Sequence, residues 1–551
     1  MLYKYICSVT TILLGTCTAT FGFPNPSADC TSVPLVDATV DQLQQGLRQR
    51  CFNSVDLVTA YLSRIYEVNS TLHTVLETNP DVYGIAMRMD MERRRGLTRG
   101  PLHGIPVLIK DIIGTKDKMQ TAMGSYALVG AQVPADATVV TKLREQGMII
   151  MGKTSLSEWA NVRSSNPSNG WNARGGQTYG AYYPKQDPSG SSSGSAVSTD
   201  LGLAAVTLGS ETSGSILLPS GLNNVVGIKP TVGLTSRYMV VPISERADTI
   251  GPISRTVKDA ALMLQVIAGP DPKDNYTLAS PFGDHLPDYA AACNLAGLQG
   301  KRIGIPRNVL DAMDPTNEAI RTAFDNAVAT IGGAGATVID NTNFTAYIDY
   351  TQSMSPSIVI AADFVSGLST YLTQLTRNPN NLHGLSSVRE FVHSHPALED
   401  YPSRDTNTWD LALDSGVDNQ SPEFWAFYQE SLFFGDEGGL LGALARDNLD
   451  AVILPTIIAA EIPALVGTPA ISVPLGAFPD GTPVQYNPRG DLVTAAPGAP
   501  FGISFLGPKW SEEALIGMAY AFEQRTLVRG SLERYLEPRT EVRMGRWGFS
   551  S

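Results

Sequence analysis

The sequence predicts a large α/β protein, and three observations support this fold class. Short apolar runs alternate with turns along much of the chain, at residues 105–109, 148–151, 201–208 and 225–228. Patterns of helical spacing lie between some of these runs, at 136–146 and 257–267, and such alternation is typical of α/β proteins. The 551 residues are 43% hydrophobic and 17% charged, which leaves enough apolar surface for a sizeable core.

The first 22 residues have the features of a secretory signal peptide. Lys4 precedes a short apolar stretch, and small residues and a proline-containing segment follow it. The apolar stretch is too short to span a membrane. Cleavage after Ala19 and cleavage after Gly22 both fit this pattern. We therefore expect residues 1–22 to be removed and residues 23–551 to be secreted as a single domain.

The five cysteines are compatible with an oxidising compartment. Cys7 and Cys17 would leave with the signal peptide, so Cys30, Cys51 and Cys293 remain. One interpretation pairs Cys30 with Cys51 and leaves Cys293 free. The other is three buried thiols, and the sequence does not decide between them.

Glycosylation sequons fit a secreted protein as well. N-x-S/T triplets begin at Asn69, Asn275 and Asn343, which are candidate glycosylation sites. A fourth triplet, at Asn419, is weaker because Pro422 follows it. Such triplets also arise by chance.

Two features of the composition bear on partners and cofactors. The formal net charge is −13, from 53 acidic and 40 basic residues, so nucleic acid and anionic membranes should repel the protein. His393 and His395 could bind a metal as a pair, but no third ligand is apparent, and structural roles are favoured. We expect a small-molecule substrate, no cofactor and no metal, and the oligomeric state stays open.

The N-terminal part and the Gly/Ser-rich segment differ in character. Residues 36–97 are predicted to be helical, because apolar side chains recur near helical spacing and Asn53–Ser54 offers an N-cap. Residues 161–200 are rich in Gly, Ser, Asn and Pro and have no periodic apolar face. Strand-like runs flank this segment closely, so we expect an ordered loop over the strand ends, where α/β sites form, and not a disordered linker.

The C-terminal half contains two further kinds of segment. Residues 270–445 are more helical and carry no recognisable motif. Residues 451–476 are apolar with a single charge, Glu461, and are long enough to suggest a membrane helix. Four prolines in this segment argue against that, and two buried strands around a turn fit better.

Three segments carry residues suited to catalysis, and the first ends at Lys110. This lysine follows the apolar run 105–109, and a charged lysine at the end of a buried strand is costly unless it is paired. Either Asp111 pairs with it, or it reaches water, or it is neutral and acts as a base. Position alone does not decide, since Lys153 and Lys229 also follow apolar runs.

The second segment is the serine-rich loop 189–195. Gly190–Gly194 matches the G-x-S-x-G elbow of α/β-hydrolases, with Ser192 as the nucleophile. That motif requires a strand immediately before it, and the proline-containing residues 184–188 are unsuited to a strand. We therefore do not expect Ser192 to be the nucleophile.

The third segment runs from Leu208 to Ile216 and is entered from a buried apolar run. A turn of small residues after such a run can point successive backbone N–H groups into one space, as an oxyanion hole requires. An ordinary strand-to-helix turn is the plainer interpretation of this segment taken alone.

Together these segments resemble the amidase signature family of serine hydrolases, to which one of the subunits of the glutamyl-tRNA amidotransferase is related. The matching motifs occur in order at residues 104–111, 152–159, 187–195, 211–216, 226–234 and 248–252, with weaker matches at 450–455, 467–476 and 501–523. The resemblance implies a large mixed β-sheet flanked by helices on both faces. It also implies a signature core at about 100–260, a variable helical substrate region at about 270–445 and a return to the core at about 446–525.

The resemblance also implies roles for individual residues. Ser215 matches the acylated nucleophile, Ser191 the proton-shuttling serine whose peptide bond is cis, and Lys110 the base. The oxyanion hole would comprise the N–H groups of Thr212, Ser213, Gly214 and Ser215. This chain departs from the family where Ser213 replaces the first of two glycines and where Leu217 replaces an arginine; both departures concern substrate fit and local packing.

A lysine base must be neutral, which sets a further expectation. Free lysine titrates near pH ~10.4, and a working base needs a pKa of roughly 7–8. Burial and hydroxyl partners can lower the pKa of Lys110 by this amount. Asp111 would oppose that shift if it faced the amine, so we expect it to point away.

Several functions remain open from the sequence. The first is a secreted amidase that hydrolyses carboxylic acid amides through an acyl-enzyme. The second is an ester or peptide hydrolase with Ser192 as nucleophile and a downstream histidine, and the third is a non-catalytic relative that only binds. The amidotransferase component is a further relative, but the signal peptide and the acidic charge count against that role.

Overall fold

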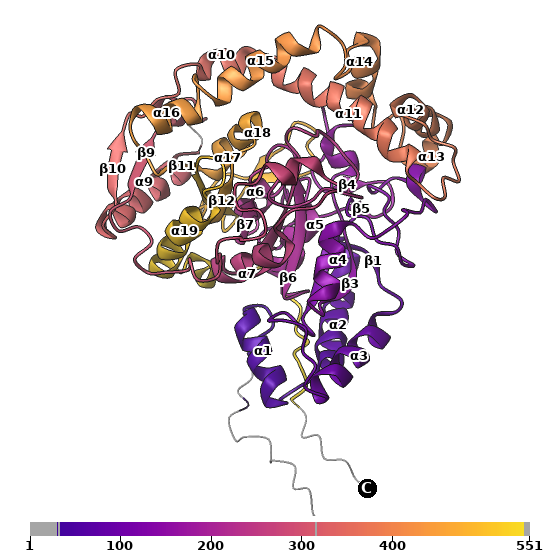
Figure 1. Ribbon diagram of the computed structural model, residues 1–551. Coiled ribbons are helices and arrows are strands. Elements are labelled where there is room, and N and C mark those ends of the chain that lie inside the picture. Colours follow the sequence, from indigo (N-terminus) through magenta and orange to yellow (C-terminus); the bar gives the residue numbers. More distant parts are fainter. Residues whose placement is uncertain (1–29, 31–32, 315–316, 545–551) are drawn as a thin grey trace, which may run out of the picture.

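The computed structural model describes residues 30, 33–314 and 317–544 (Figure 1). The predicted signal peptide lies outside these residues. An 11-stranded sheet forms the centre, with the order β1-β3-β2-β6-β8-β7-β12-β15-β11-β9-β10. The sheet is mixed, since β2 pairs in parallel with β3 and β6, whereas β8, β7, β12 and β15 pair in antiparallel fashion. The predicted fold class is confirmed.

The strands are β1 (Val75–Thr78), β2 (Pro106–Lys110), β3 (Ile149–Thr154), β4 (Trp171–Asn172), β5 (Gly176–Gln177), β6 (Val206–Glu211), β7 (Val226–Lys229), β8 (Thr249–Ser254), β9 (Arg302–Ile305), β10 (Thr337–Asp340), β11 (Ala451–Pro455), β12 (Ala470–Ala477), β13 (Gln485–Tyr486), β14 (Val493–Ala495) and β15 (Pro500–Leu506). The helices up to α9 are α1 (Val40–Gln49), α2 (Ser54–Leu72), α3 (Val82–Arg94), α4 (Thr138–Glu145), α5 (Ser193–Asp200), α6 (Leu217–Leu222), α7 (Val257–Ile267), α8 (Arg307–Asp311) and α9 (Glu318–Gly333). The later helices are α10 (Tyr347–Gln352), α11 (Ser355–Thr373), α12 (Leu385–Ser394), α13 (Pro396–Glu399), α14 (Asn407–Ser415), α15 (Phe424–Gly435), α16 (Leu440–Arg446), α17 (Thr456–Ala459), α18 (Ile462–Val466) and α19 (Glu512–Thr526).

Helices cover both faces of the sheet. Helices α4, α7 and α19 pack in series on one face, and α5 and α6 pack against each other on the other. The helices expected at 136–146 and 257–267 correspond to α4 and α7. The apolar run 201–208 enters its strand later than expected, because residues 201–205 form the turn that leads from α5 into β6.

Residues 36–97 form the three predicted helices α1, α2 and α3, but the expectation of a wholly helical segment is wrong, because β1 lies between α2 and α3 and pairs with β3. Asn53 caps α2, where its side chain accepts a hydrogen bond from the Asp56 N–H and the Asp56 carboxylate accepts one from the Asn53 N–H. Cys30 and Cys51 form a disulfide with a Cα–Cα distance of 5.7 Å, and Cys293 is a free thiol. The structure thus contains the disulfide that the sequence left undecided.

Residues 451–476 contain the two predicted buried strands, β11 and β12. The expectation of a simple turn between them is wrong, because the short helices α17 and α18 lie there instead. Pro463 lies in the first turn of α18, and Gly467 ends the helix in the left-handed region at φ 68°, a conformation that glycine adopts without steric cost. No helix among the described residues is long and apolar enough to cross a membrane.

The predominantly helical residues 270–445 include an arch above the sheet. Helices α10, α15, α11 and α14 follow one another along the top of Figure 1, with α17 and α18 beneath them. Helix α15 packs against both α11 and α18, so the arch is joined to the core on its lower side.

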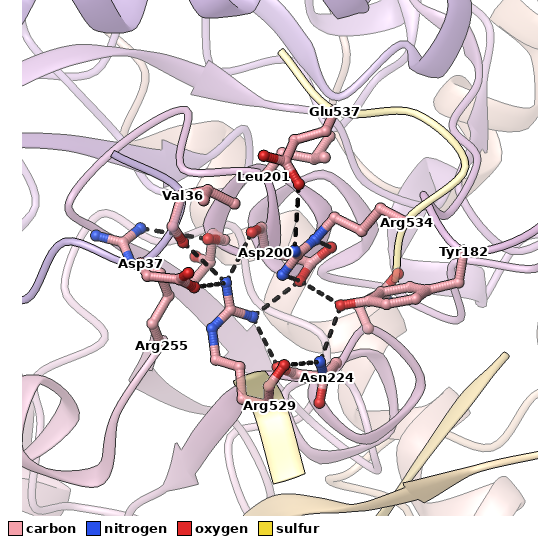
Figure 2. Close-up of polar contacts among 12 residues, drawn as sticks. Val36, Asp37, Tyr182, Asp200, Leu201, Asn224, Arg255, Arg529, Arg534 and Glu537 are labelled. Atoms are coloured by element: carbon pink, nitrogen blue, oxygen red, sulfur yellow. Dashed lines mark hydrogen bonds and ion pairs between the residues drawn. The ribbon is translucent and has the colours of Figure 1, made fainter. Parts of the chain in front are cut away.

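A C-terminal strap, residues 528–541, crosses the N-terminal part of the protein. Arg529 and Arg534 both contact the buried Asp200 carboxylate, at 2.8 and 2.7 Å, and the Tyr182 hydroxyl donates a hydrogen bond to it at 2.8 Å (Figure 2). Burial opposes ionisation of Asp200, but the two arginines lower the pKa of its carboxyl below the usual value. Because Asp200 ends α5, the strap holds the helix that begins just after Ser191.

Candidate active site

Lys110 lies at the carboxyl end of β2, a strand buried along its whole length. Strand β2 pairs in parallel with β6, where Ile109 lies opposite Leu208. The carboxyl ends of the two strands therefore meet at the same edge of the sheet. Ser210, near the end of β6, lies beside the lysine for this reason.

The Lys110 amine has three polar contacts. Its Nζ lies 2.7 Å from Ser191 Oγ, 3.0 Å from Ser210 Oγ and 3.1 Å from the Ser210 carbonyl oxygen. A neutral amine has two N–H donors and one lone pair, so three partners of this kind satisfy it completely. Burial lowers the pKa of Lys110 from 10.5 to about 7, although the Glu211 and Asp248 carboxylates oppose the shift. A large fraction of Lys110 is therefore neutral near pH 7.

Ser191 connects the lysine to Ser215. Its Oγ lies 3.0 Å from Ser215 Oγ, which completes a chain from Nζ through two hydroxyl groups. The Gly190–Ser191 peptide bond is cis, as the family resemblance implies. The backbone N–H of Ser157 donates a hydrogen bond to the Ser191 carbonyl at 3.1 Å, which helps to hold the serine-rich loop 189–195 in place. Lys110 and Ser191 are almost fully buried, whereas Ser215 retains 8% exposure, so Ser215 is the hydroxyl of the chain that a substrate can reach.

The loop that carries Ser215 is held by two carboxylates. Glu211 Oε2 accepts hydrogen bonds from the Ile216 and Leu217 N–H groups at 2.7 and 2.9 Å. Burial raises the pKa of Glu211, and Lys229 and the surrounding N–H groups, including that of Gly214, oppose this. On the other side, the Thr212 hydroxyl donates to Asp248 at 2.6 Å. The backbone from 212 to 217 is thereby fixed around the nucleophile position.

Asp111 points away from the Lys110 amine, as expected. Its carboxylate accepts a hydrogen bond from the Gly124 N–H at 3.1 Å and pairs with Arg174 at 3.3 Å. Lys110 forms no ion pair with a carboxylate among the described residues. The amine is thus free to exchange a proton with Ser191.

A comparison with known proteins identifies the family. The family model for amidases matches residues 56–516, which is most of the chain. The chain belongs to the amidase family. An amidase homologue of Arthroderma benhamiae is 52% identical over 93% of this chain and 90% of its own length. A peptide amidase structure from Stenotrophomonas maltophilia has a TM-score of 0.81 at 35% identity, covering 92% of this chain and 99% of that one.

The similarity extends to a component of a different enzyme. One of the subunits of a glutamyl-tRNA(Gln) amidotransferase of Geobacter metallireducens is 30% identical over 89% of this chain and 98% of its own length. Membership of the family makes this protein an amide-hydrolysing enzyme, as the sequence motifs implied.

The structure does not support Ser192 as a nucleophile. In this amidase no strand leads directly into Ser192, since residues 184–192 form turns and loops. The Ser192 side chain is fully buried, and its Oγ donates a hydrogen bond to the Ser210 carbonyl at 3.1 Å. A hydroxyl in that position serves the packing of the loop against β6.

Three residues around the site were not predicted as functional: Ser210, Glu211 and Asp248. Ser210 contacts Lys110, Glu211 holds the loop that carries Ser215, and Asp248 holds Thr212. Glu211 carried a usable signal, because a charged residue inside an otherwise small and apolar motif is costly unless it has partners. The roles of Ser210 and Asp248 depend on strand pairing, which no single motif specifies.

The histidine pair does not form a metal site. His393 Nε2 lies 2.9 Å from Thr406 Oγ1, and the His395 ring stacks on Phe391 with 4.1 Å between centroids. Within the described part of the chain, no group of three or more His, Cys, Asp or Glu side chains could hold a metal ion. Both histidines have structural contacts.

The glycosylation candidates differ in accessibility. Asn275 is exposed at the start of a short 3-10 helix. The Asn69 amide donates to the Val75 carbonyl at 2.9 Å, and Asn343 accepts from the Asn308 N–H at 3.2 Å. Asn275 is therefore the candidate whose modification disturbs the fold least.

A cavity of about 630 Å³ lies next to the nucleophile loop. We call it the arch cavity, because α10, α11 and α15 form one side and α17 and α18 the other. Ser213, two residues before Ser215, is part of its wall. The volume is typical of sites that bind drug-sized molecules. Residues 270–445 contribute much of the lining.

Proposed function

We propose that this amidase is a secreted enzyme that hydrolyses carboxylic acid amides through an acyl-enzyme on Ser215, with Ser191 and Lys110 as the proton relay. The observation that supports it best is the chain from Lys110 Nζ to Ser191 Oγ to Ser215 Oγ, with steps of 2.7 and 3.0 Å. Such distances allow a proton to pass between neighbouring groups.

The relay activates a hydroxyl that is otherwise a weak nucleophile. As Ser215 Oγ attacks the amide carbonyl, its proton passes to Ser191 Oγ and the Ser191 proton passes to the neutral amine of Lys110. When the tetrahedral intermediate collapses, the C–N bond breaks and the leaving amine takes a proton back along the same path. Water then attacks the ester of Ser215 by the same relay and releases the carboxylic acid.

The oxyanion of the intermediate needs hydrogen-bond donors. We assign this role to the backbone N–H groups of Thr212, Ser213 and Ser215. The Gly214 N–H, which the family resemblance also implies, interacts with the Glu211 carboxylate instead. The hydrogen bonds to Glu211 and Asp248 support the assignment, because they fix this backbone before the substrate arrives. Losing one such donor typically costs ~10²–10³ in rate.

The substrate class and the location are parts of the same proposal. The similarity to a peptide amidase and the size of the arch cavity favour amides with an extended acyl part, such as peptide amides. The Cys30–Cys51 disulfide supports secretion, because disulfides persist in oxidising compartments. We infer that residues 1–22 direct export, that Asn275 carries a glycan, and that neither nucleic acid nor a membrane span takes part.

The test is active-site labelling of the purified protein with a fluorophosphonate, followed by mapping of the modified peptide. We expect a single modification at Ser215 that Ser215→Ala abolishes together with release of ammonia from amides. Ser192→Ala is the matched control and should keep the label. A label on Ser192, or turnover that survives Ser215→Ala, would refute the assignment.

A further inference from the structure

The arch cavity carries an unbalanced charge that bears on substrate choice. Two charged side chains line it, Arg246 and Glu461. They come from different segments: Arg246 lies in the loop before β8, and Glu461 is one of the two residues between α17 and α18. Their charged partners differ, and this determines which of the two side chains can attract an oppositely charged substrate.

The positive charge of Arg246 is compensated within the wall. Its guanidinium pairs with the buried Asp363 and with Glu245, the latter at 2.9 Å. It also lies over the rings of Phe424 and Tyr428, with 4.7 and 5.0 Å to their centroids. A group with two carboxylates and two aromatic faces as partners has little remaining attraction for an anionic substrate.

Glu461 is compensated much less. It is exposed, and its carboxylate accepts a hydrogen bond from the Tyr350 hydroxyl at 3.4 Å. No lysine, arginine or histidine among the described residues forms an ion pair with it. Burial and, in second place, the Glu461 charge raise the pKa of Tyr347 and of Tyr350, so both phenols stay neutral at any physiological pH. Neither phenol therefore balances the charge of Glu461, and the carboxylate lines the cavity without an ion-pair partner among the described residues.

Aromatic faces accompany the carboxylate. Tyr347, Tyr350 and Tyr428 all line the cavity, and the first two rings lie with 6.1 Å between their centroids. A carboxylate that has no ion-pair partner among the described residues and lies beside tyrosine rings is suited to an ammonium or guanidinium group, which gains an ion pair and cation–π contacts. The same set disfavours a carboxylate.

We propose that the arch cavity selects amides whose acyl part carries a cationic group, such as a peptide amide with a basic side chain, and that Glu461 is the specificity-determining contact. The inference rests on the proposed function, since it assigns the acyl part of the substrate to the cavity beside Ser213. It adds the charge of the preferred substrate, which the catalytic residues do not determine.

The experiment uses N-acetylated tripeptide amides in which one residue is lysine, norleucine or glutamate, placed at each of the three positions in turn. Norleucine matches the length of the lysine stem without its charge. Release of ammonia gives kcat and KM for the full-length protein, for Glu461→Gln and for Glu145→Gln. The last variant removes the same charge from an exposed residue on α4, which does not line the cavity.

For one position of the tripeptide, we expect kcat/KM for lysine to exceed that for norleucine by about threefold to tenfold, mainly through KM, with glutamate the poorest. Glu461→Gln should bring the lysine-to-norleucine ratio close to one, mainly by raising KM for the lysine peptide, whereas Glu145→Gln should keep the preference. Added salt should weaken the preference for lysine without affecting norleucine.

Three outcomes would overturn the inference: equal rates for lysine and norleucine at every position, a lysine preference that survives Glu461→Gln, or a preference for glutamate. The last would assign substrate choice to Arg246. Failure of the proposed function is distinguishable from these, because then Ser215→Ala would not affect hydrolysis of the norleucine peptides.

Discussion

Replacing Lys110 by methionine tests whether the amine is neutral in the folded protein. Methionine keeps the length of the side chain but has no titrating group. The lysine pKa is about 7 in the folded state against 10.5 for the ordinary side chain, so the folded protein binds fewer protons at this site than the unfolded chain does. The free energy of unfolding of the wild type should then rise with pH between these two values, and the methionine variant should lack that rise.

The magnitude follows from the two pKa values. At pH 6 the lysine is mostly protonated in both the folded and the unfolded protein, and burying it costs about 5 kcal/mol. At pH 9 it is neutral in the folded protein, and the cost is about 2 kcal/mol. Loss of the hydrogen bonds to Ser191 and Ser210 offsets part of the gain in the variant, at about 1 kcal/mol each. This second contribution does not depend on pH. The stability of Lys110→Met relative to wild type should therefore be higher at pH 6 than at pH 9 by about 3 kcal/mol.

The assay is urea unfolding followed by circular dichroism at the two pH values, after two-state behaviour has been checked by calorimetry. Lys116→Met, at an exposed lysine, is the control and should show no such change with pH. Activity should be abolished in Lys110→Met and kept in Lys116→Met. A stability difference that is the same at pH 6 and pH 9, or larger at pH 9, would show that Lys110 is charged in the folded state and would refute the relay.

Three further predictions concern the site and its support. The value of kcat/KM should decrease about tenfold per pH unit below pH 7, because Lys110 becomes protonated. A decrease that begins only near pH 5 would contradict a lysine base. Glu211→Gln should lower kcat about tenfold, because the backbone around Ser215 loses a charged acceptor, and should move the acid limb to lower pH, because that carboxylate raises the pKa of Lys110. If kcat decreased but the acid limb stayed at the same pH, Glu211 would have only a packing role. Asp200→Asn should lower the free energy of unfolding in urea by about 3 kcal/mol, because Arg529 and Arg534 stay buried without their carboxylate partner. The kcat of the folded fraction should not change. An unchanged unfolding midpoint would show that the strap adds no stability.

The sequence predicted which three residues lie together at the candidate site, but it did not predict which contacts hold them there. Lys110, Ser191 and Ser215 could be named because their motifs, taken together and in order, resemble the amidase signature family; each motif taken alone left other interpretations open. Their approach to one another depends on the parallel pairing of β2 with β6, which the alternation of apolar runs implies only in general terms. The strand register, and with it the position of Ser210, could not be read from the sequence.

The ion pairs between residues far apart in the chain could not be predicted from the sequence. Arg246 and Asp363 are separated by 117 residues, and Arg529 contacts a carboxylate 329 residues away. Neither pair leaves a pattern, because arginine and aspartate are ordinary surface residues until a fold buries them. The arch cavity could not be predicted from the sequence either, because much of its wall comes from residues 270–445, which the sequence predicts only as a helical region.

Burial alone does not distinguish Lys110, the proposed base, from the other buried lysines. Lys229 is as completely buried as Lys110, and burial lowers its pKa to about 8, against the opposing carboxylates of Glu211 and Glu512. The Lys229 amine, however, donates to backbone carbonyl oxygens, that of Thr468 at 2.7 Å among them, and a carbonyl has no proton to give. Lys110 instead faces a hydroxyl that leads to Ser215. A lowered lysine pKa makes a base available in both places, and only the chain of hydroxyl groups connects one of them to a nucleophile.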